Sequence, residues 1–183
     1  TGAHAIGDAA RMIMWEDADV MVAGGAEAAC CRLGMAGFCS ARALSTGFNE
    51  FPENASRPWD KDRDGFVMGE GAGCVVLKRL EDAMADGDTI YSVIRGIGSS
   101  SDGRGKGITA PSTRGQKQAV MRAYQQAGYS PSSVELIEAH GTSTKVGDAT
   151  ELSTLAGVFA DRGAGDFVAV GSVKSQIGHL KAA

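Results

Sequence analysis

The fold of this chain is decided by the stretch Glu138-Ala139-His140-Gly141-Thr142-Ser143-Thr144-Lys145-Val146-Gly147-Asp148, together with the stretch Gly171-Ser172-Val173-Lys174-Ser175-Gln176-Ile177-Gly178-His179. Each stretch follows a short apolar run and opens into a helical pattern, which predicts a loop at the end of a strand. Two of the chain's three histidines lie in these loops. Because loops on a rigid scaffold usually carry the chemistry of a protein, the pair predicts a functional site.

Outward from these stretches, short apolar runs alternate with helical patterns. We expect strands at residues 19–23, 74–78, 90–97, 134–139 and 168–170, and helices at 3–14, 80–86, 112–127, from 148 and from 175 onward. The first helix is poor in polar groups, so we expect it to be buried on most sides, with His4 packed in the core. The alternation predicts an α/β fold with largely parallel strand pairing.

Two features of the chain bear on how this fold is organised. Residues 26–68 form a long irregular stretch, and a loop of that length is usually functional or structured by local helices. Asp148 and Glu151 have the spacing of a capping box at the start of a helix. The apolar residues of that helix are expected to face the core: Leu152, Leu155, Ala156 and Phe159.

Composition argues against two classes of function. The 183 residues are 43% hydrophobic and 22% charged, which is ordinary for a globular protein. A formal charge of −4 and the lack of a Lys/Arg cluster argue against nucleic-acid binding. No run approaches the roughly 18 apolar residues that a membrane-spanning helix needs.

The cysteines and the chain ends indicate the setting of the protein. Cys30, Cys31, Cys39 and Cys74 show no C-x-x-C pair and no secreted-framework spacing, which favours a reducing, cytoplasmic compartment. The chain starts at Thr1 without a methionine and stops inside a helical pattern. We therefore expect a fragment of a longer protein.

Several motifs favour a structural interpretation over a binding one. The glycines 69, 71 and 73 precede a strand, whereas a dinucleotide-binding fingerprint follows a strand and opens a helix, so tight backbone packing is favoured. The segment 103–107 lacks the order of a phosphate-binding loop. Metal binding by the histidines lacks further ligands at suitable spacing. A Cys–His catalytic pair stays open, but no cysteine has a base nearby in sequence.

The residues next to the two histidines indicate a chemical role for them. A neutral imidazole just past a strand end, flanked by glycine and hydroxyl residues, can donate its N–H group to a developing oxyanion. Lys174 precedes His179 by five residues and would add a positive charge to the same pocket. A purely solvated lysine is disfavoured there, because the positive end of a helix dipole would repel it.

These residues resemble the β-ketoacyl synthases, the condensing enzymes of fatty-acid and polyketide assembly. Residues 138–144 and 173–179 resemble the family's two histidine motifs, and residues 57–66 and 69–73 resemble its central segment. The similarity covers essentially all of the chain. It implies a thiolase-like, layered α-β-α fold, incomplete in this fragment, with residues 1–98 from the N-terminal half and 99–183 from the C-terminal half.

The resemblance also implies a role for each site residue. His140, Lys174 and His179 would be catalytic, with Lys174 supporting His140, and Thr142 and Thr144 would bind the phosphopantetheine arm of an acyl carrier protein. Glu151 resembles a carboxylate that the family keeps near the site. The family's nucleophilic cysteine would lie two residues before Thr1, and none of the four cysteines matches it.

The implied activity is that of an acyltransferase, a 3-oxoacyl-[acyl-carrier-protein] synthase. It would perform a decarboxylative Claisen condensation of an acyl-enzyme thioester with a malonyl carrier-protein thioester. We expect a homodimer in the full-length protein, no bound cofactor, no metal, no nucleic acid and no membrane. A non-catalytic partner subunit, similar to a chain-length factor, is the alternative, and a thiolase is a weaker one. The central segment resembles discrete synthases, whereas residues 108–112 and 171–179 resemble domains of multifunctional synthases.

Overall fold

The computed structural model describes residues 2–105, 107, 110–163 and 167–181. The chain forms two compact units. The first comprises Thr1–Met35, Met68–Ile94 and Leu180–Ala183, and the second comprises Ala36–Val67 and Arg95–His179. Residues 108 and 109, which carry part of the subtype resemblance, and residues 182 and 183 of the expected last helix lie outside the described residues.

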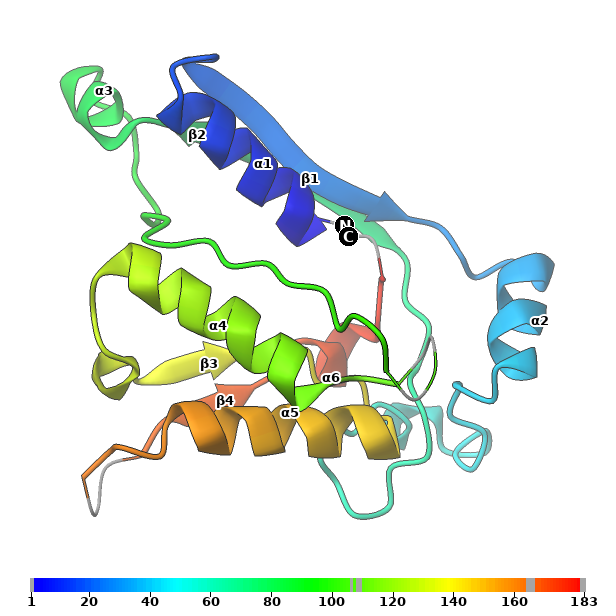
Figure 1. Cartoon of the computed structure of the whole chain (residues 1–183). Helices are drawn as coiled ribbons and strands as arrows, with labels where there is room; N and C mark the ends of the chain where they lie inside the picture. Colours follow the sequence, from blue (N-terminus) through cyan, green and yellow to red (C-terminus); the bar gives the residue numbers. More distant parts are fainter. Residues whose placement is uncertain (1, 106, 108–109, 164–166, 182–183) are drawn as a thin grey trace. The chain divides into compact units, whose positions relative to one another are not determined.

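The first unit is a two-stranded ribbon covered by a helix. Strands β1 (Val20–Glu27) and β2 (Gly71–Lys78) pair antiparallel, from Val20 opposite Lys78 to Glu27 opposite Gly71. Helix α1 (Gly2–Met14) packs along the ribbon, and the short helix α3 (Leu80–Ala85) follows β2 (Figure 1). Glycines allow the two strands to approach each other closely, since a Cβ atom on Gly24 of β1 would collide with the carbonyl oxygen of Gly73 of β2.

Three expectations for this part of the chain are wrong. The β1–β2 pair is antiparallel, because strand direction depends on which strands become neighbours, and a local apolar run does not encode that. Helix α1 is not buried on most sides, since its buried residues are Gly7, Ala9 and Ile13, and His4 is exposed. Residues 90–97 are not a strand in the structure, because an apolar run becomes a strand only where a partner accepts its hydrogen bonds.

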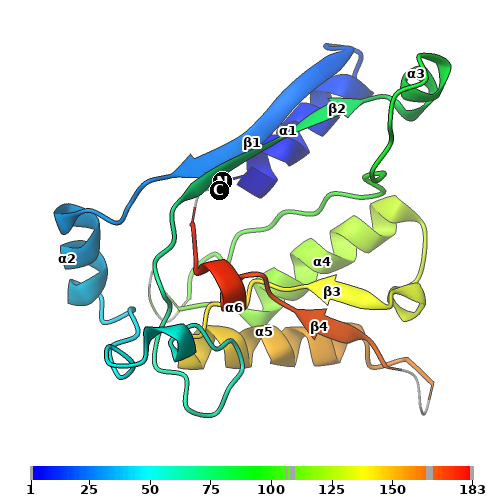
Figure 2. The ribbon, with the colours of Figure 1, turned by 180° about the vertical axis from the view of Figure 1, so that it is seen from behind.

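The second unit contains a parallel strand pair and the longer helices. Strands β3 (Leu136–Glu138) and β4 (Ala169–Gly171) run parallel, and Figure 2 shows them side by side with α6 (Lys174–Ile177) beyond β4. The N–H group of Ala139 donates to the carbonyl of Gly171 at 2.8 Å, which extends the ladder up to the two histidine loops. The second unit also contains the short 3-10 turns η1 (Pro52–Asn54) and η2 (Pro131–Ser133). Helix α2 (Arg32–Ser40) contains the boundary along the chain at which the first segment of the first unit ends, after Met35.

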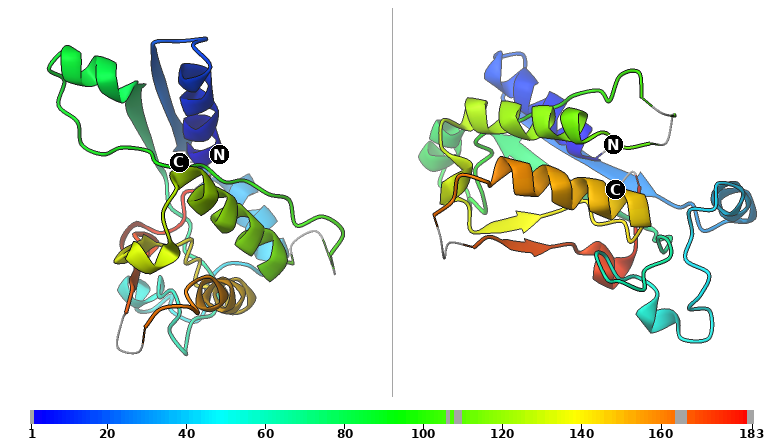
Figure 3. Two further views of the ribbon diagram at one scale, coloured as in Figure 1. Left: turned by 60° about the vertical axis from the view of Figure 1, so that its left-hand side comes forward. Right: turned by 60° about the horizontal axis from the view of Figure 1, so that its bottom comes forward.

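The predicted start and end of helix α4 (Thr113–Ala127) are confirmed. The Ser112 side chain accepts the N–H group of Gly115, and Gly128 ends the helix in the left-handed conformation with φ of 77°. The helix packs against α5 (Lys145–Val158), where Tyr124 and Phe159 make an edge contact with ring centroids 6.3 Å apart (Figure 3).

The interpretation of Asp148 and Glu151 as a capping box is wrong. Helix α5 begins at Lys145, so Asp148 lies inside the helix and Thr144 is its N-cap. The buried residues of the helix are Asp148, Thr154 and Val158, whereas Leu152 is 42% exposed and Ala156 is exposed. The helix is rotated in this way because the Asp148 carboxylate finds backbone N–H partners inside the unit, which makes its burial tolerable. The last helix is also short, since α6 ends at Ile177.

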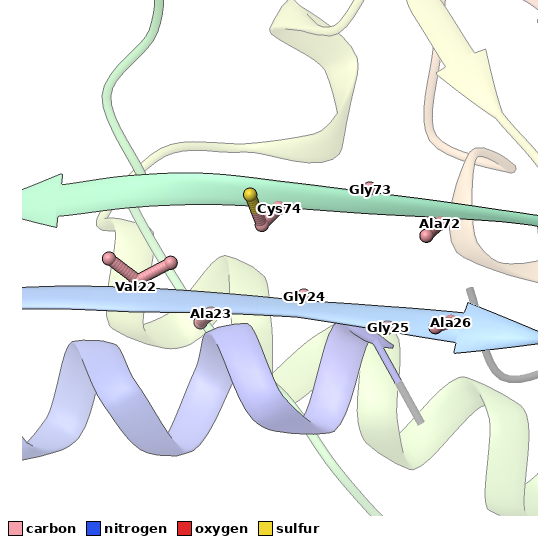
Figure 4. Close-up of a pocket in the computed structure, with 8 residues that line it drawn as sticks. All are labelled: Val22, Ala23, Gly24, Gly25, Ala26, Ala72, Gly73 and Cys74. Carbon is pink, nitrogen blue, oxygen red and sulfur yellow. The ribbon is translucent and has the colours of Figure 1, made fainter.

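A shallow hollow lies along the β1–β2 ribbon. Figure 4 shows its lining residues on the two strands: Val22, Ala23, Gly24, Gly25, Ala26, Ala72, Gly73 and Cys74. These side chains are small or absent, and none is charged. Gly71 and Gly73 lie within β2 rather than at a helix start, so the phosphate-binding interpretation lacks its structural context. Among the described residues, no helix is long and apolar enough to cross a lipid bilayer.

Candidate active site

The two predicted histidines lie side by side in the second unit. Their ring centroids are 5.1 Å apart, with the rings nearly perpendicular at 89°. His140 follows β3, and His179 follows α6, where its backbone N–H donates to the carbonyl of Val67 at 2.8 Å. The His179 ring also makes a T-shaped contact with the buried Phe66 ring, with ring centroids 5.5 Å apart. Residues that are 39 positions apart in sequence thus share one site.

Lys174 is electrostatically coupled to His140. It occupies the first turn of α6 and is half-buried, and its carbonyl oxygen accepts the hydroxyl of Ser56. Its positive charge acts on His140, whose pKa it lowers after the larger effect of burial.

The His140 imidazole is held in its neutral form. Loss of hydration lowers its pKa below the ordinary value of 6.5, and the charge of Lys174 lowers it further. The carboxylates of Glu151 and Asp148 act in the opposite direction but do not reverse the shift. His140 is nevertheless accessible to solvent, so the imidazole can be reached while its neighbours lower its pKa.

Glu151 supports the loop that carries His140. Its two carboxylate oxygens accept the backbone N–H groups of His140 at 2.6 Å and of Gly141 at 2.8 Å. Hydrogen bonds from backbone N–H groups to a carboxylate are among the stronger ones in proteins. The loop after β3 is therefore fastened to α5 directly beneath the histidine.

Asp148, one turn earlier on α5, fastens two further backbone positions. It is 0% exposed, and its carboxylate accepts the N–H of Ser143 at 3.1 Å and the N–H of Trp59 at 2.8 Å. The Nε atom of Arg63 forms an ion pair with the same carboxylate at 3.1 Å. Ser143 and Trp59 both have positive φ, 65° and 63°, which is uncommon for residues with a side chain.

Thr142 and Thr144 form a hydroxyl pair next to these loops. Their Oγ1 atoms are 2.9 Å apart, within hydrogen-bonding distance. Both hydroxyls approach Gly147 of α5 closely enough that a side chain there would disturb them. The structure thus brings both predicted arm-binding threonines together in the loop of His140.

Sequence reasoning did not assign any role to the central segment in this arrangement. The N–H of Arg57 donates to the hydroxyl of the buried Ser143 at 2.8 Å, and the Trp59 ring packs against Gly141. The signal that pointed to the segment was its resemblance to a family motif. The contacts themselves join residues 86 and 89 positions apart, which no local pattern reveals.

Asp64 anchors the end of the same segment. Burial opposes ionisation of its carboxylate, but hydrogen bonds from the hydroxyl of Ser45 at 2.6 Å and from the N–H groups of Thr46 and Gly47 outweigh it. The pKa of Asp64 consequently lies below its ordinary value of 3.8. Asp64 therefore holds the backbone at residues 45–47 in place.

The arrangement suits the stabilisation of an oxyanion. Two imidazoles, of which one is held neutral, and a nearby cation can present N–H donors and positive potential to a developing negative charge. Within the described ranges, no group of three or more His, Cys, Asp or Glu side chains is placed to hold a metal ion. The cysteines at positions 30, 31, 39 and 74 are free thiols.

Comparison with known families yields matches over nearly the whole chain. A family model described as "Beta-ketoacyl synthase, N-terminal domain" matches residues 1–83, and one described as "Beta-ketoacyl synthase, C-terminal domain" matches residues 91–183. Among curated proteins, 3-oxoacyl-[acyl-carrier-protein] synthase 2 of Rhizobium meliloti is 50% identical over 98% of this chain and 42% of its own length. The mitochondrial 3-oxoacyl-[acyl-carrier-protein] synthase of Arabidopsis thaliana is 47% identical over 98% of this chain and 39% of its own length.

Solved structures give the same result. The ketosynthase from module 6 of the bacillaene synthase of Bacillus subtilis 168 has a TM-score of 0.89 and 38% identity, over 98% of this chain and 31% of that one. A type II polyketide ketosynthase in complex with its acyl-carrier protein has a TM-score of 0.91 and 32% identity, over 98% of this chain and 43% of that one. This chain spans less than half the length of these relatives.

Proposed function

This chain belongs to the β-ketoacyl synthase family, and we propose that it supplies the histidine-bearing part of an acyltransferase that performs decarboxylative Claisen condensation. The matched structures confirm the predicted thiolase-like α/β fold. The observation that carries the proposal is the paired arrangement of His140 and His179, with Lys174 acting electrostatically on His140.

The proposed reaction requires these residues to stabilise the negative charge of an enolate oxygen. The bond between the carboxylate carbon and the α-carbon of a malonyl thioester breaks, carbon dioxide leaves, and the electron pair passes to the α-carbon and onto the thioester oxygen. The N–H groups of His140 and His179 stabilise that enolate oxygen, because preorganised donors act most strongly where charge develops. The α-carbon then bonds to the carbonyl carbon of an acyl thioester, whose thiolate leaves. By the resemblance, that thioester is held by a cysteine other than the four in this chain.

A neutral His140 suits this chemistry better than a cationic one. An imidazolium would form an ion pair with the malonyl carboxylate and so stabilise the ground state that must lose carbon dioxide. Burial lowers the pKa of His140, and the charge of Lys174 lowers it further, so both favour the uncharged imidazole. This gives Lys174 a supporting role that does not require contact with the substrate.

The substrates are proposed to arrive on an acyl carrier protein. The names of the matched synthases refer to acyl carrier protein, and one matched ketosynthase was solved in complex with its own. The hydroxyls of Thr142 and Thr144, beside His140, offer donors and acceptors to the amides of a phosphopantetheine arm. A homodimer, a cytoplasmic location and the absence of a bound cofactor stay predictions, as does a division of the chain at residues 98 and 99.

The non-catalytic alternative is less well supported. A subunit that only pairs with an active synthase has no need for a histidine pair in which burial and the charge of Lys174 lower the pKa of His140. The complete arrangement of His140, His179 and Lys174 therefore favours a catalytic subunit.

The test is the decarboxylation of malonyl carrier-protein thioester by the full-length protein that carries this chain, followed as released labelled carbon dioxide. His140→Ala and His179→Ala should each lower the rate by about a hundredfold or more, as expected for loss of an oxyanion donor. His4→Ala is the matched control, since His4 is exposed on α1 and should leave the rate unchanged. Equal rates for His140→Ala, His179→Ala and wild type would overturn the proposal.

A further inference from the structure

The buried carboxylate of Asp148 bridges two strained turns that come from different parts of the chain. Its Oδ1 atom accepts the N–H of Ser143, and its Oδ2 atom accepts the N–H of Trp59. Both residues have positive φ, a conformation that normally suits glycine. A residue with a side chain persists there only when surrounding contacts enforce it.

We propose that Asp148 is a positioning residue that sets the geometry of the Thr142–Thr144 hydroxyl pair, and through it the binding of the carrier arm. The inference rests on the proposed function, because it assigns the arm to those two threonines. Ser143 lies between the threonines in sequence, so its φ of 65° determines how the two hydroxyls are directed relative to each other. In this conformation the two Oγ1 atoms point toward each other and lie 2.9 Å apart.

The central segment secures the other side of the same turn. The Ser143 hydroxyl accepts the N–H of Arg57, and the Trp59 backbone is held by Asp148. Arg63 balances the charge of the Asp148 carboxylate through the ion pair at 3.1 Å. Asp148 itself is 0% exposed, so a substrate cannot reach it, and its influence passes through the backbone positions that it holds, Ser143 and Trp59.

Glu151 and Asp148, both on α5, thus hold different parts of the loop that follows β3. Glu151 accepts the N–H groups of His140 and Gly141, on the catalytic side of the loop. Asp148 accepts the N–H of Ser143, on the threonine side. Loss of Asp148 should therefore affect binding of the carrier arm more than it affects the decarboxylation step itself.

The experiment measures kcat and KM for malonyl carrier-protein thioester with the full-length protein. Asp148→Asn keeps the shape but replaces one acceptor oxygen by an amide donor, and it should raise KM about tenfold with kcat changed less than about threefold. In a Thr142→Val/Thr144→Val background, Asp148→Asn should raise KM no further, within about twofold, because residues that act through one another are not additive.

A matched control separates this role from general destabilisation. Thr154 is buried on the same helix, and its hydroxyl donates to Gln116 at 2.7 Å. Thr154→Val removes a buried hydrogen bond without touching the turn at Ser143, so its KM should stay at the wild-type value. An equal KM increase in Thr154→Val, or an additive increase from Asp148→Asn in the double-valine background, overturns the inference.

A second variant tests the same idea if Asp148→Asn alone does not fold. Ser143→Gly removes the strain that the Asp148 contact has to hold, since only glycine adopts positive φ without strain. The double variant Ser143→Gly/Asp148→Asn should therefore fold, with a KM within about twofold of that of Ser143→Gly. A double variant that does not fold, or whose KM exceeds that of Ser143→Gly by about tenfold, overturns the inference. A wild-type protein that does not decarboxylate the thioester at all contradicts the proposed function instead.

Discussion

The Oε1 atom of Glu151 accepts the backbone N–H group of His140 at 2.6 Å. This contact explains how a loop residue that is partly open to solvent keeps a defined orientation. The helix that follows the loop returns its own side chain to the loop's backbone, so that α5 and His140 hold each other in place.

Glu151→Gln should lower kcat by about tenfold to a hundredfold, because one of the two N–H groups at His140 and Gly141 would lose its acceptor and the imidazole would shift. The effect should appear in the decarboxylation rate, with KM for the carrier thioester nearly unchanged. Glu53→Gln, on the exposed turn η1, is the control and should behave like wild type. A Glu151→Gln variant that changes KM alone would contradict the separate roles of Glu151 at His140 and of Asp148 at the threonine pair.

Lys174→Met should raise the pKa of His140, because the positive charge that lowers it is removed. The proposed chemistry uses neutral His140, and its rate should therefore fall as pH drops through the pKa of His140. In Lys174→Met this acid limb should move to higher pH, as measured by a pH profile of decarboxylation. Lys145→Met is the control, since Lys145 is exposed and is not a cause of the His140 shift. An unmoved acid limb in Lys174→Met would show that His140 does not limit the profile.

Asp64→Asn should make the protein less sensitive to acid. The folded-state pKa of Asp64 lies below its ordinary value of 3.8, so the carboxylate contributes stability above that value and loses it as pH falls through the folded-state pKa. The free energy of unfolding should thus fall less steeply below about pH 4 in the variant than in wild type. Asp62→Asn, at an exposed position, should keep the wild-type slope. Identical slopes for Asp64→Asn and wild type would mean that Asp64 is not ionised preferentially in the folded state.

Gly128→Ala should lower the free energy of unfolding by about 1 kcal/mol, because alanine is strained in the left-handed conformation that ends α4. No atom lies within 4 Å of the added Cβ, so φ of 77° is the only source of the effect. Gly157→Ala, inside α5 and with only the Nζ atom of Lys117 at 4.0 Å, should instead raise it by about 0.5–1 kcal/mol. Denaturant unfolding of both variants measures the two signs, and the same sign in both would refute the explanation.

Several parts of the fold were accessible from local sequence signals. The Ser112 cap and the Gly128 stop of α4, the short strands before His140 and Lys174, and the two loops of the site all follow from patterns within a few neighbouring residues. The directions of strand pairing could not be predicted from local signals. Strand β1 pairs antiparallel with β2, which begins 44 residues after β1 ends. The buried face of α5 was missed because its inward residue is a carboxylate, and burial of Asp148 becomes favourable only once Trp59 and Ser143 supply their N–H groups.

The sequence by itself singled out the residues that we propose carry the chemistry: His140, His179 and Lys174 by their places at strand ends, and Thr142 and Thr144 by the resemblance to a family motif. Only the tertiary structure decided how they are held. The carboxylates of Asp148 and Glu151, the strained turns at Ser143 and Trp59 and the contact of Arg57 with Ser143 depend on hydrogen bonds that close in space rather than along the chain. Local patterns report on neighbours a few residues away, whereas this support comes from segments that meet only after folding.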